Sequence, residues 1–318
     1  MQMISADDIC SVLDWHGVLD AMRSAHRGPR PKGESYFIGD ASFGLFSRGV
    51  ILPGQGAGFK VVSLRPANTA AYPPLPMEDA AFMVVDEDSK RFLALLDGPE
   101  ITRWKTAADS ALASSILSRV DSEMLLVVGA GPVARALTDA HLVVRPAIHE
   151  VLLWNRTPSK LEEVCSDLKA RGLKVEIAGD LDAAVASADI ITSATSATTP
   201  LIRGECIRAG THVDLVGGYR PDMQEADCNV FKGARIYVDY RQNALQSGDL
   251  RKPIESQIIA AEEIEGDLFD LCQLDSFSRS ADDRTVYKNA GGAHLDLIVS
   301  QHVILQLLLD QAIRDDRA

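Results

Sequence analysis

The sequence predicts an α/β protein whose larger part is a doubly wound parallel sheet and whose N-terminal part is a smaller α+β region. The first observation is a series of short apolar runs between residues 125 and 238, most of them separated by helical or loop segments. Alternation of this kind is typical of parallel strands joined by crossover helices. The second observation is a group of β-like runs between residues 44 and 96 with no helical segment between them, which indicates a meander sheet.

The N-terminal region is expected to begin with a helix over residues 6–27, where apolar side chains recur at helical spacing. The Gly- and Pro-rich stretch 28–33 breaks that pattern. Strands are then expected at residues 44–52, 59–64, 80–85 and 91–96. The acidic turn 86–89 joins the last two strands as a hairpin, and a helix is expected at 99–118.

The larger sheet is expected to contain six strands, at residues 125–128, 151–154, 174–177, 190–192, 212–216 and 235–238. Beyond it, residues 285–289 are strand-like, and Gly291-Gly292 interrupts the pattern. The last segment, 293–313, is a helix too apolar for a single amphipathic stripe. It is expected either to return to the first domain or to be buried between subunits.

Composition and charge narrow the class of protein. With 318 residues the chain is long enough for two domains with separate cores. A net charge of −13 and a pI near 5.0 argue against nucleic acid or an anionic membrane as a partner. The five cysteines are scattered, which suits a reducing compartment, and the histidines form no recognisable metal-ligand motif. The histidine pattern also makes a catalytic metal unexpected. Neither a signal peptide nor a membrane span is evident, so a soluble, cytoplasmic protein is expected.

The glycine turn after the first strand of the larger sheet predicts a dinucleotide site. The pattern is Gly129-x-Gly131-x-x-Ala134. Gly129 permits a tight turn, Gly131 lets the backbone approach a pyrophosphate, and Ala134 keeps the helix close to the strand. The N-terminus of that helix offers unpaired N–H groups to the phosphates. A glycine turn in some other α/β protein is the alternative.

The end of the second strand favours NADP over NAD. A site for NAD usually carries Asp or Glu there, which accepts hydrogen bonds from the ribose hydroxyls. This chain has Arg156 instead, followed by Thr157 and Lys160. A guanidinium can bind a 2′-phosphate through two parallel bonds, whereas a carboxylate would repel it. NADPH is therefore the expected cofactor, with NADH less favoured.

Several stretches resemble the ornithine cyclodeaminase/mu-crystallin family. They are residues 97–108 (DGPEITRWKTAA), 154–157 (WNRT), 216–222 (VGGYRPD), 238–239 (VD) and 285–291 (TVYKNAG). The resemblance implies a homodimer with a Rossmann-type NADP-binding domain at 119–292. It also implies a substrate-binding and dimerisation domain formed by 1–118 together with 293–318. Members of the family include ornithine cyclodeaminase, alanine dehydrogenase, opine-type dehydrogenases and ketimine reductases.

Tyr219 helps to choose among these activities. Members that act on a free amino acid typically carry an Asp at this place, and a primary ammonium needs such a carboxylate partner. A cyclic imine has at most one N–H and can be served by a neutral group. The resemblance to the mu-crystallin branch therefore implies NADPH-dependent reduction of Δ1-pyrroline-2-carboxylate to proline and of Δ1-piperideine-2-carboxylate to pipecolate. A cyclodeaminase, an alanine or opine dehydrogenase, and a non-catalytic NADPH-binding protein remain alternatives.

The resemblance implies that the substrate carboxylate binds to Lys60 and Lys105. Lys60 lies on an apolar strand, where an unpaired lysine is unusual, although a lysine guarding a sheet edge would look the same. Lys105 stands where the family usually has Arg, and it lies in a helix of small residues that would also suit tight packing. An N-terminal arginine should complete the clamp, and Arg30 is preferred to Arg48.

Other site residues follow from the resemblance. Asn68 would lie near the substrate, although Asn in a Pro turn is commonly structural. The proton donor is left open among Tyr219, His294 and water, and a lone histidine is more often structural. The residues expected to contact the cofactor are Thr106, Gly129, Gly131, Pro132, Val133, Ala134, Asn155, Arg156, Thr157, Lys160, Thr195, Val216, Gly217, Lys288 and Asn289.

Overall fold

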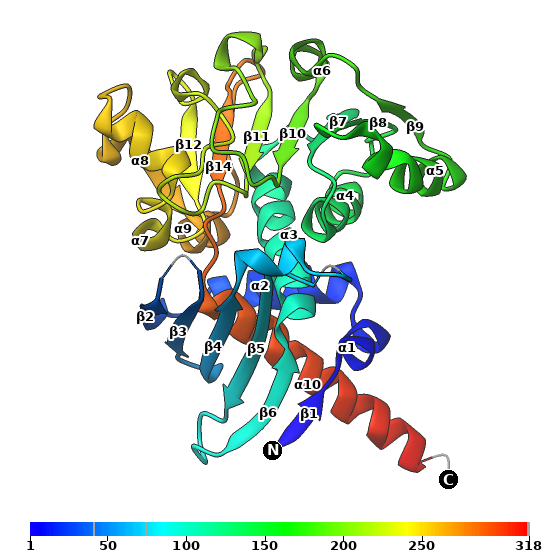
Figure 1. Ribbon diagram of the computed structural model, residues 1–318, viewed down its shortest axis with the longest axis vertical. Coiled ribbons are helices and arrows are strands. Elements are labelled where there is room, and N and C mark those ends of the chain that lie inside the picture. Colours follow the sequence, from blue (N-terminus) through cyan, green and yellow to red (C-terminus); the bar gives the residue numbers. More distant parts are fainter. Residues whose placement is uncertain (41, 74, 317–318) are drawn as a thin grey trace. The chain divides into compact units, whose positions relative to one another are not determined.

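The computed structural model describes residues 1–40, 42–73 and 75–316, and it divides into two compact units (Figure 1). Unit 1 is Met1–Lys105 together with Gly292–Ala318, and unit 2 is Thr106–Gly291. Helix α3, Gly98–Leu117, begins in the first unit and ends in the second. The division into a substrate-binding and a cofactor-binding domain, at 1–118 with 293–318 and at 119–292, stays a prediction.

Unit 1 contains a six-stranded sheet in the order β1-β6-β5-β4-β3-β2. Strands β1 and β6 run parallel, and the other neighbours are antiparallel, as a meander requires. The strands are β1 Gln2–Ile4, β2 Lys32–Gly39, β3 Gly44–Leu52, β4 Gly56–Leu64, β5 Glu78–Val85 and β6 Phe92–Asp97. The two edge strands were not predicted. Every residue of β2 is exposed, so β2 shows no alternation of buried and exposed positions and its pairing with β3 is its main support.

The helices of unit 1 correct one expectation. Residues 6–27 form two helices rather than one, α1 Ala6–Val12 and α2 Trp15–His26. The break lies at Asp14, whose carboxylate accepts a hydrogen bond of 3.0 Å from the N–H of Gly17 and so caps the second helix. A short 3₁₀ helix, η1 Pro66–Ala70, follows β4.

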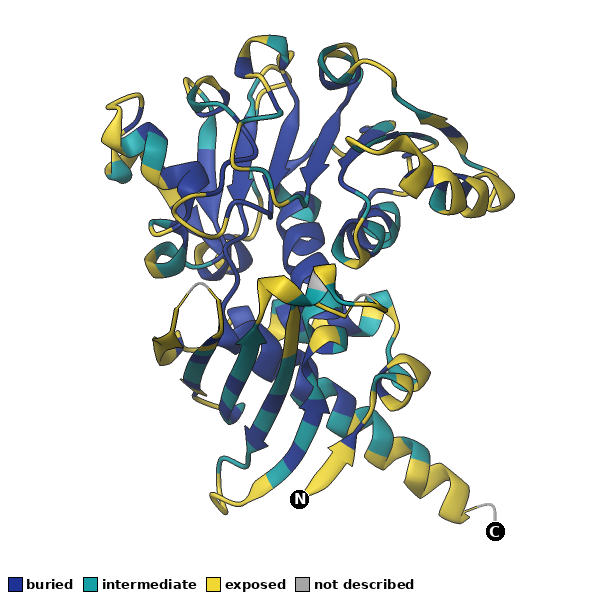
Figure 2. Cartoon of the chain, viewed as in Figure 1, coloured by how far each residue is buried: buried dark blue, intermediate teal, exposed yellow. Residues whose placement is uncertain are grey.

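The C-terminal helix α10, Ala293–Asp316, packs against β3, β4, β5 and α2 of unit 1. This is the first of the two places expected for it. Its N-terminal half is buried, whereas Leu305, Leu308 and Ile313 in its C-terminal half are about half exposed or more (Figure 2).

Unit 2 contains an eight-stranded sheet in which every neighbouring pair is parallel. The strands follow the order β13-β12-β14-β11-β10-β7-β8-β9. They are β7 Met124–Val128, β8 Glu150–Trp154, β9 Lys174–Ile177, β10 Ile190–Ser193, β11 His212–Leu215, β12 Arg235–Val238, β13 Ile264–Asp267 and β14 Thr285–Lys288. Strand order reverses at β7, and a crevice at the carboxyl ends of the strands is expected at such a point.

The expected count of six strands was too low for this sheet. Strand β14 was expected beyond the sheet but lies inside it, between β12 and β11. Strand β13 has four residues, one of them Gly266, and this length gives too few positions for a periodic pattern. All four residues of β10, β11 and β14 are buried, as is typical of central parallel strands (Figure 2).

The connections of unit 2 are mostly helical. The helices are α4 Pro132–Val144, α5 Glu162–Ala170, α6 Leu181–Ser187, α7 Arg241–Ala244, α8 Gly248–Glu255 and α9 Leu268–Gln273. Shorter 3₁₀ turns are η2 Pro158–Leu161, η3 Gly204–Cys206, η4 Cys228–Val230 and η5 Ala261–Glu263. Within the described ranges, no helix has both the length and the apolar character needed to cross a membrane.

Candidate active site

A buried group of charged side chains lies inside unit 1. Lys60 on β4 donates hydrogen bonds of 2.6 Å to Asp296 Oδ1 and 2.6 Å to Thr102 Oγ1. Lys105 on α3 approaches the other carboxylate oxygen of Asp296 with its Nζ at 3.5 Å. Lys60, Lys105 and Asp296 are exposed by only 7%, 5% and 1%, so the group is almost removed from water. Two predicted carboxylate-binding lysines therefore meet around one acid.

Arg48 joins this group from the neighbouring strand. Arg48 on β3 is the direct antiparallel partner of Lys60 on β4, and directly opposed residues point to the same face of a sheet. The electrostatic influence of Arg48 also reaches Asp296. Arg30, the preferred arginine, is instead exposed in the loop between α2 and β2. The structure thus brings the competitor, Arg48, to Lys60, whereas the charge of Arg30 acts on His26.

Burial and charge together set the protonation states of this cluster, which we call the cation cluster (Arg48, Lys60, Lys105 and Asp296). Burial lowers the pKa of Lys60, and the attraction of Asp296 offsets only part of that effect. Burial alone would raise the pKa of Asp296, but Lys105 and Lys60 outweigh it and hold that pKa below its usual range. Lys60 and Lys105 therefore share one carboxylate, and the charge of Arg48 also acts on it, so this concentration of positive charge suits an anionic ligand.

His294 lies two residues before Asp296 on α10, and its ring meets that of His26 edge-on, with centroids 5.6 Å apart. Burial lowers the pKa of His294 far below the usual value, and the charges of His26, Lys105 and Arg48 act in the same direction. His294 is therefore neutral at physiological pH. Such a ring is a poor source of a full positive charge or of a readily lost proton.

Asn68 has a structural role in the described chain. Its side-chain amide donates a 2.9 Å hydrogen bond to the carbonyl of Pro76, and its own carbonyl accepts from the N–H groups of Ala71 and Leu75. These bonds fold the segment after β4 into a compact turn. They account for Asn68 without a ligand, which is the alternative given for it above.

The glycine turn of unit 2 has the geometry that a phosphate-binding turn needs. Gly129 follows β7 with φ +131°, and a Cβ there would meet the carbonyl oxygen of Ala194 at 2.5 Å. Gly131 is the N-cap of α4, with no side chain capping the helix and no atom within 4 Å of an added Cβ. Pro132 takes the first helical position, where its missing N–H costs nothing. Open space in front of an uncapped helix N-terminus fits a pyrophosphate.

The end of β8 is basic and open to solvent. Arg156, Thr157 and Lys160 are exposed, and Asn155 Nδ2 donates a 2.9 Å bond to the carbonyl of Thr157. This bond shapes the turn that presents Arg156.

Thr195, Val216 and Gly217 lie together in the structure because one buried acid, Glu225, binds all three. Its carboxylate accepts from the N–H and hydroxyl of Thr195 at 2.6 and 2.9 Å, and from the N–H of Val216 at 3.1 Å and that of Gly217. Sequence reasoning missed Glu225, because nothing in the polar stretch around it distinguishes it from a surface acid. It also missed Asp296, although an acid within the apolar run of α10 was a visible signal.

Lys288 and Asn289, at the end of β14, are engaged inside unit 2. Lys288 is fully buried, and its Nζ donates to the carbonyl of Leu215 at 3.1 Å and to Asp249 at 3.2 Å. Asn289 donates to the carbonyl of Thr106 at 3.0 Å. This bond connects the part of α3 that belongs to unit 2 with the end of β14. Tyr219 is 45% exposed and lies in the loop after β11.

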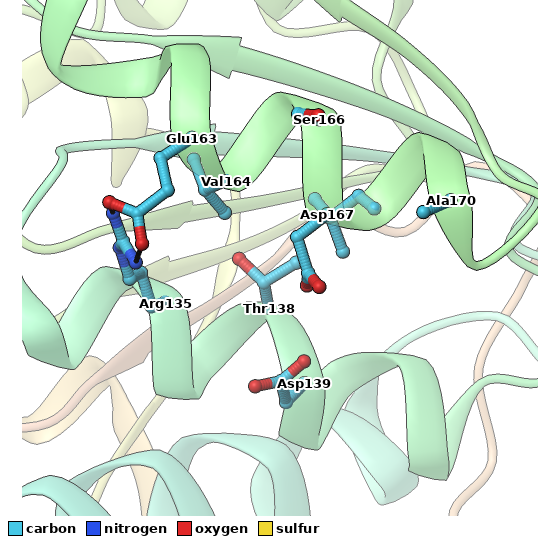
Figure 3. Close-up of a pocket in the computed structure, with 9 residues that line it drawn as sticks. Arg135, Thr138, Asp139, Glu163, Val164, Ser166, Asp167 and Ala170 are labelled. Carbon is cyan, nitrogen blue, oxygen red and sulfur yellow. Dashed lines mark hydrogen bonds and ion pairs between the residues drawn. The ribbon is translucent and has the colours of Figure 1, made fainter.

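A groove of about 630 Å³ between α4 and α5 is lined by none of the predicted site residues (Figure 3). Arg135 and Glu163 point toward one another across it, at 2.8 Å. Asp139 and Asp167 lie further along it, and Arg171 pairs with both at 2.6 and 3.8 Å. In residues 1–40, 42–73 and 75–316, no group of three His, Cys, Asp or Glu side chains could hold a metal ion.

A doubly wound unit with a phosphate-binding turn, joined to a unit with a buried cation cluster, is typical of enzymes that use a dinucleotide on an anionic substrate. Comparison with known proteins gives the particular family. The profile of the ornithine cyclodeaminase/mu-crystallin family matches residues 52–308, and the chain belongs to this family.

Relatives cover almost the whole chain. A Delta(1)-pyrroline-2-carboxylate reductase of Paracoccus denitrificans is 39% identical over 95% of this chain and 96% of its own length. One from Colwellia psychrerythraea is 33% identical, with 96% and 99% covered. Among solved structures, the reductase of the same name from Thermococcus litoralis, in complex with NADH and L-proline, superimposes with a TM-score of 0.90. It is 25% identical, and the match covers 98% of both chains.

Proposed function

We propose that this protein reduces cyclic ketimines that carry a carboxylate next to the C=N bond, with a nicotinamide cofactor as the reductant. The substrates are Δ1-pyrroline-2-carboxylate and Δ1-piperideine-2-carboxylate, and the products are proline and pipecolate. The observation that carries the proposal is the cation cluster, in a chain that is 39% identical to a Delta(1)-pyrroline-2-carboxylate reductase. A carboxylate ligand would take up the positive excess of that cluster.

The lysines act by fixing the substrate. Lys60 uses two of its three N–H donors on Asp296 and Thr102, so one remains for a ligand in the described part of the chain. Lys105 and Arg48 supply further positive charge. A carboxylate held in this way orients the adjacent imine carbon, and orientation of this kind can supply most of the rate enhancement. The bound nicotinamide supplies the hydride.

Protonation of the imine nitrogen makes its carbon electrophilic, so a proton donor or a preprotonated substrate is needed. His294 is neutral because burial lowers its pKa far below the usual value. This favours Tyr219 or water as the donor. No covalent intermediate with the protein is needed.

We further propose that NADPH is the preferred cofactor. Support comes from the exposed Arg156 and Lys160 at the end of β8, where a site for NAD would present an acid. The relative from Thermococcus litoralis holds NADH in its complex, so the preference is a property that has to be measured on this chain.

We also propose that the protein is a homodimer that associates through unit 1. Edge strand β2 exposes Tyr36, Phe37 and Ile38 by at least half, and α10 exposes Leu305 and Leu308 to a similar extent. Large apolar side chains exposed on an edge strand and on a helix are typical of a protein interface. Light scattering during gel filtration should therefore give twice the 34.4 kDa mass of the chain.

Turnover with purified substrates tests the main proposal. The loss of NADPH absorbance is followed with each cyclic ketimine, and ammonia release from ornithine is measured beside it. Reduction of at least one ketimine without ornithine activity is expected. Ammonia release from ornithine without ketimine reduction would contradict the proposal and indicate a cyclodeaminase.

A further inference from the structure

Glu225 joins two loops of unit 2 that are distant in sequence from each other. Its Oε1 accepts hydrogen bonds from Ser193 Oγ at 2.6 Å, from the N–H of Thr195 at 2.6 Å and from Thr195 Oγ1 at 2.9 Å. Its Oε2 accepts from the N–H of Val216 at 3.1 Å and from that of Gly217. One fully buried carboxylate thus holds five donors from the ends of β10 and β11.

These loops lie on the half of the sheet where the nicotinamide part of a dinucleotide is expected. The glycine turn after β7 and the basic turn after β8 account for the pyrophosphate and the adenosine part. The other half of a doubly wound sheet, here β10, β11 and β14, then faces the second nucleotide. The loop after β10 also borders the glycine turn, because the Ala194 carbonyl lies 2.5 Å from a Cβ added to Gly129.

Two consecutive glycines make room for this arrangement. A Cβ on Gly217 would lie 2.0 Å from the Thr195 carbonyl and 2.6 Å from the Glu225 carboxylate. A Cβ on Gly218 would lie 2.0 Å from Asp249. The Gly-Gly pair therefore lets two buried carboxylates approach the backbone, and this is the physical reason for the motif at this place.

Asp249 contacts Glu225 directly, and Lys288 contacts Asp249. Asp249 on α8 accepts from the Glu225 N–H at 2.8 Å and from Lys288 Nζ at 3.2 Å. These are the charged groups that act on Glu225 from α8 and β14. Burial first, and then the negative charge of Asp249, raises the pKa of Glu225 to about 7, while Lys288 opposes the shift.

We propose that Glu225 is a positioning residue for the nicotinamide half of the cofactor, because its ionised carboxylate fixes the loops after β10 and β11 in a single arrangement. The inference rests on the use of a nicotinamide cofactor in the proposed function. Glu225 is not a catalytic residue, because it is buried and acts through the backbone of the two loops. Its loss should therefore weaken cofactor binding while the chain stays folded.

The variant Glu225→Gln keeps the shape of the side chain but replaces one acceptor oxygen with an NH₂ donor. An amide has one acceptor oxygen and one NH₂ group, whereas the carboxylate has two acceptor oxygens. Whichever way the amide turns, its NH₂ group faces either the donors of Thr195 or those of Val216 and Gly217. The dissociation constant of NADH, measured by fluorescence titration in the absence of substrate, should rise by about tenfold or more, since at least one buried backbone N–H loses its acceptor.

Glu265→Gln is the matched control in the same unit. Glu265 on β13 is exposed, and its carboxylate binds Arg235 at 2.7 Å and accepts a hydrogen bond from the Tyr237 hydroxyl, both on β12. Its variant should bind NADH as the parent does. An unchanged NADH dissociation constant in a folded Glu225→Gln protein would overturn the proposal. If that protein does not fold, Ser193→Ala removes one donor to Glu225, and a rise of about threefold is then expected; no rise would overturn the proposal.

The pH dependence of NADH binding separates positioning from a merely structural role. A protonated Glu225 turns a hydrogen toward donors that need an acceptor, so affinity in the parent should fall as the pH drops through about 7. NADH is the probe because it lacks a 2′-phosphate that would titrate in the same range. Glu225→Gln should lose this step, and an identical pH profile in both proteins would contradict the proposal. Because binding is measured without substrate, failure of ketimine reduction would leave this test intact.

Discussion

Replacing Asp296 with Asn tests whether one carboxylate holds the cation cluster of unit 1 together. Asn keeps the shape of the side chain and can still accept the 2.6 Å hydrogen bond from Lys60, but it removes the only acid of the cluster. Lys60 and Lys105 would then be buried cations without their counter-ion. Breaking a buried ion pair in this way typically costs about 3 kcal/mol of unfolding free energy at neutral pH.

The sign of the pH dependence follows from Lys60. Burial already lowers the pKa of Lys60, and Asp296 raises it in part, so removal of Asp296 lowers it further. A lysine with a lowered folded pKa costs stability while it is charged, and the cost fades as the pH rises toward its unfolded value of about 10.4. The difference in stability between Asp296→Asn and the parent should therefore shrink from neutral pH to about pH 10.

Urea unfolding followed by far-ultraviolet circular dichroism measures this difference at both pH values. Lys60→Met, alone and combined with Asp296→Asn, completes a double-mutant cycle. The Asp296 change should cost less when Lys60 is already Met, because the shorter of the two ion pairs of Asp296 is then absent. A loss below about 1 kcal/mol at neutral pH, with additive single changes, would refute the account of the cluster.

Three further predictions concern ligand binding. Arg156→Ala should lower the ratio of kcat/KM for NADPH to that for NADH about tenfold, since a charge-assisted bond to the 2′-phosphate is lost; an unchanged ratio would exclude Arg156 from cofactor choice. Arg48→Met should raise the KM for the ketimine about tenfold or more, because a positive charge near Lys60 is lost. Arg30 is exposed, so Arg30→Met should leave this KM within about twofold. The reverse order would indicate that Arg30 binds the substrate carboxylate. Gly131→Ala should keep the Tm but weaken cofactor binding, because its added Cβ meets open space where the pyrophosphate should lie. Gly129→Ala should instead lower the Tm, because its φ is positive and its Cβ would meet the Ala194 carbonyl. Calorimetry with and without NADPH compares the two variants, and equal effects would contradict this view of the turn.

Much of the fold was predictable because its strongest elements carry local signals. The apolar strands β7, β8 and β11 and the glycine turn after β7 could be placed from periodicity and turn chemistry. Strand β14 could not be placed in order, since strand order depends on tertiary pairing and β14 enters between two earlier strands. Strand β2 showed no pattern because all its residues are exposed.

The residues of the candidate site likewise fall into those with a local sequence signal and those that depend on long-range contacts. Lys60 could be singled out because a lysine on an apolar strand needs a partner, and Lys105 because it stands where the family usually has Arg. The partner itself, Asp296, comes from the far end of the chain, and no local pattern links it to Lys60. Arg48 could not be chosen over Arg30 until the register of β3 and β4 placed Arg48 opposite Lys60. Side chains that act through long-range contacts are the ones that sequence reasoning misses.

Comparison of a carboxylated with a decarboxylated imine tests the central claim most directly. The protein is given Δ1-pyrroline-2-carboxylate or Δ1-pyrroline at equal NADPH, and kcat/KM is measured for each. If the cation cluster orients the substrate through its carboxylate, loss of that group should lower kcat/KM by about a hundredfold or more. Similar values for the two imines, or no reduction of the carboxylated one, would contradict the account.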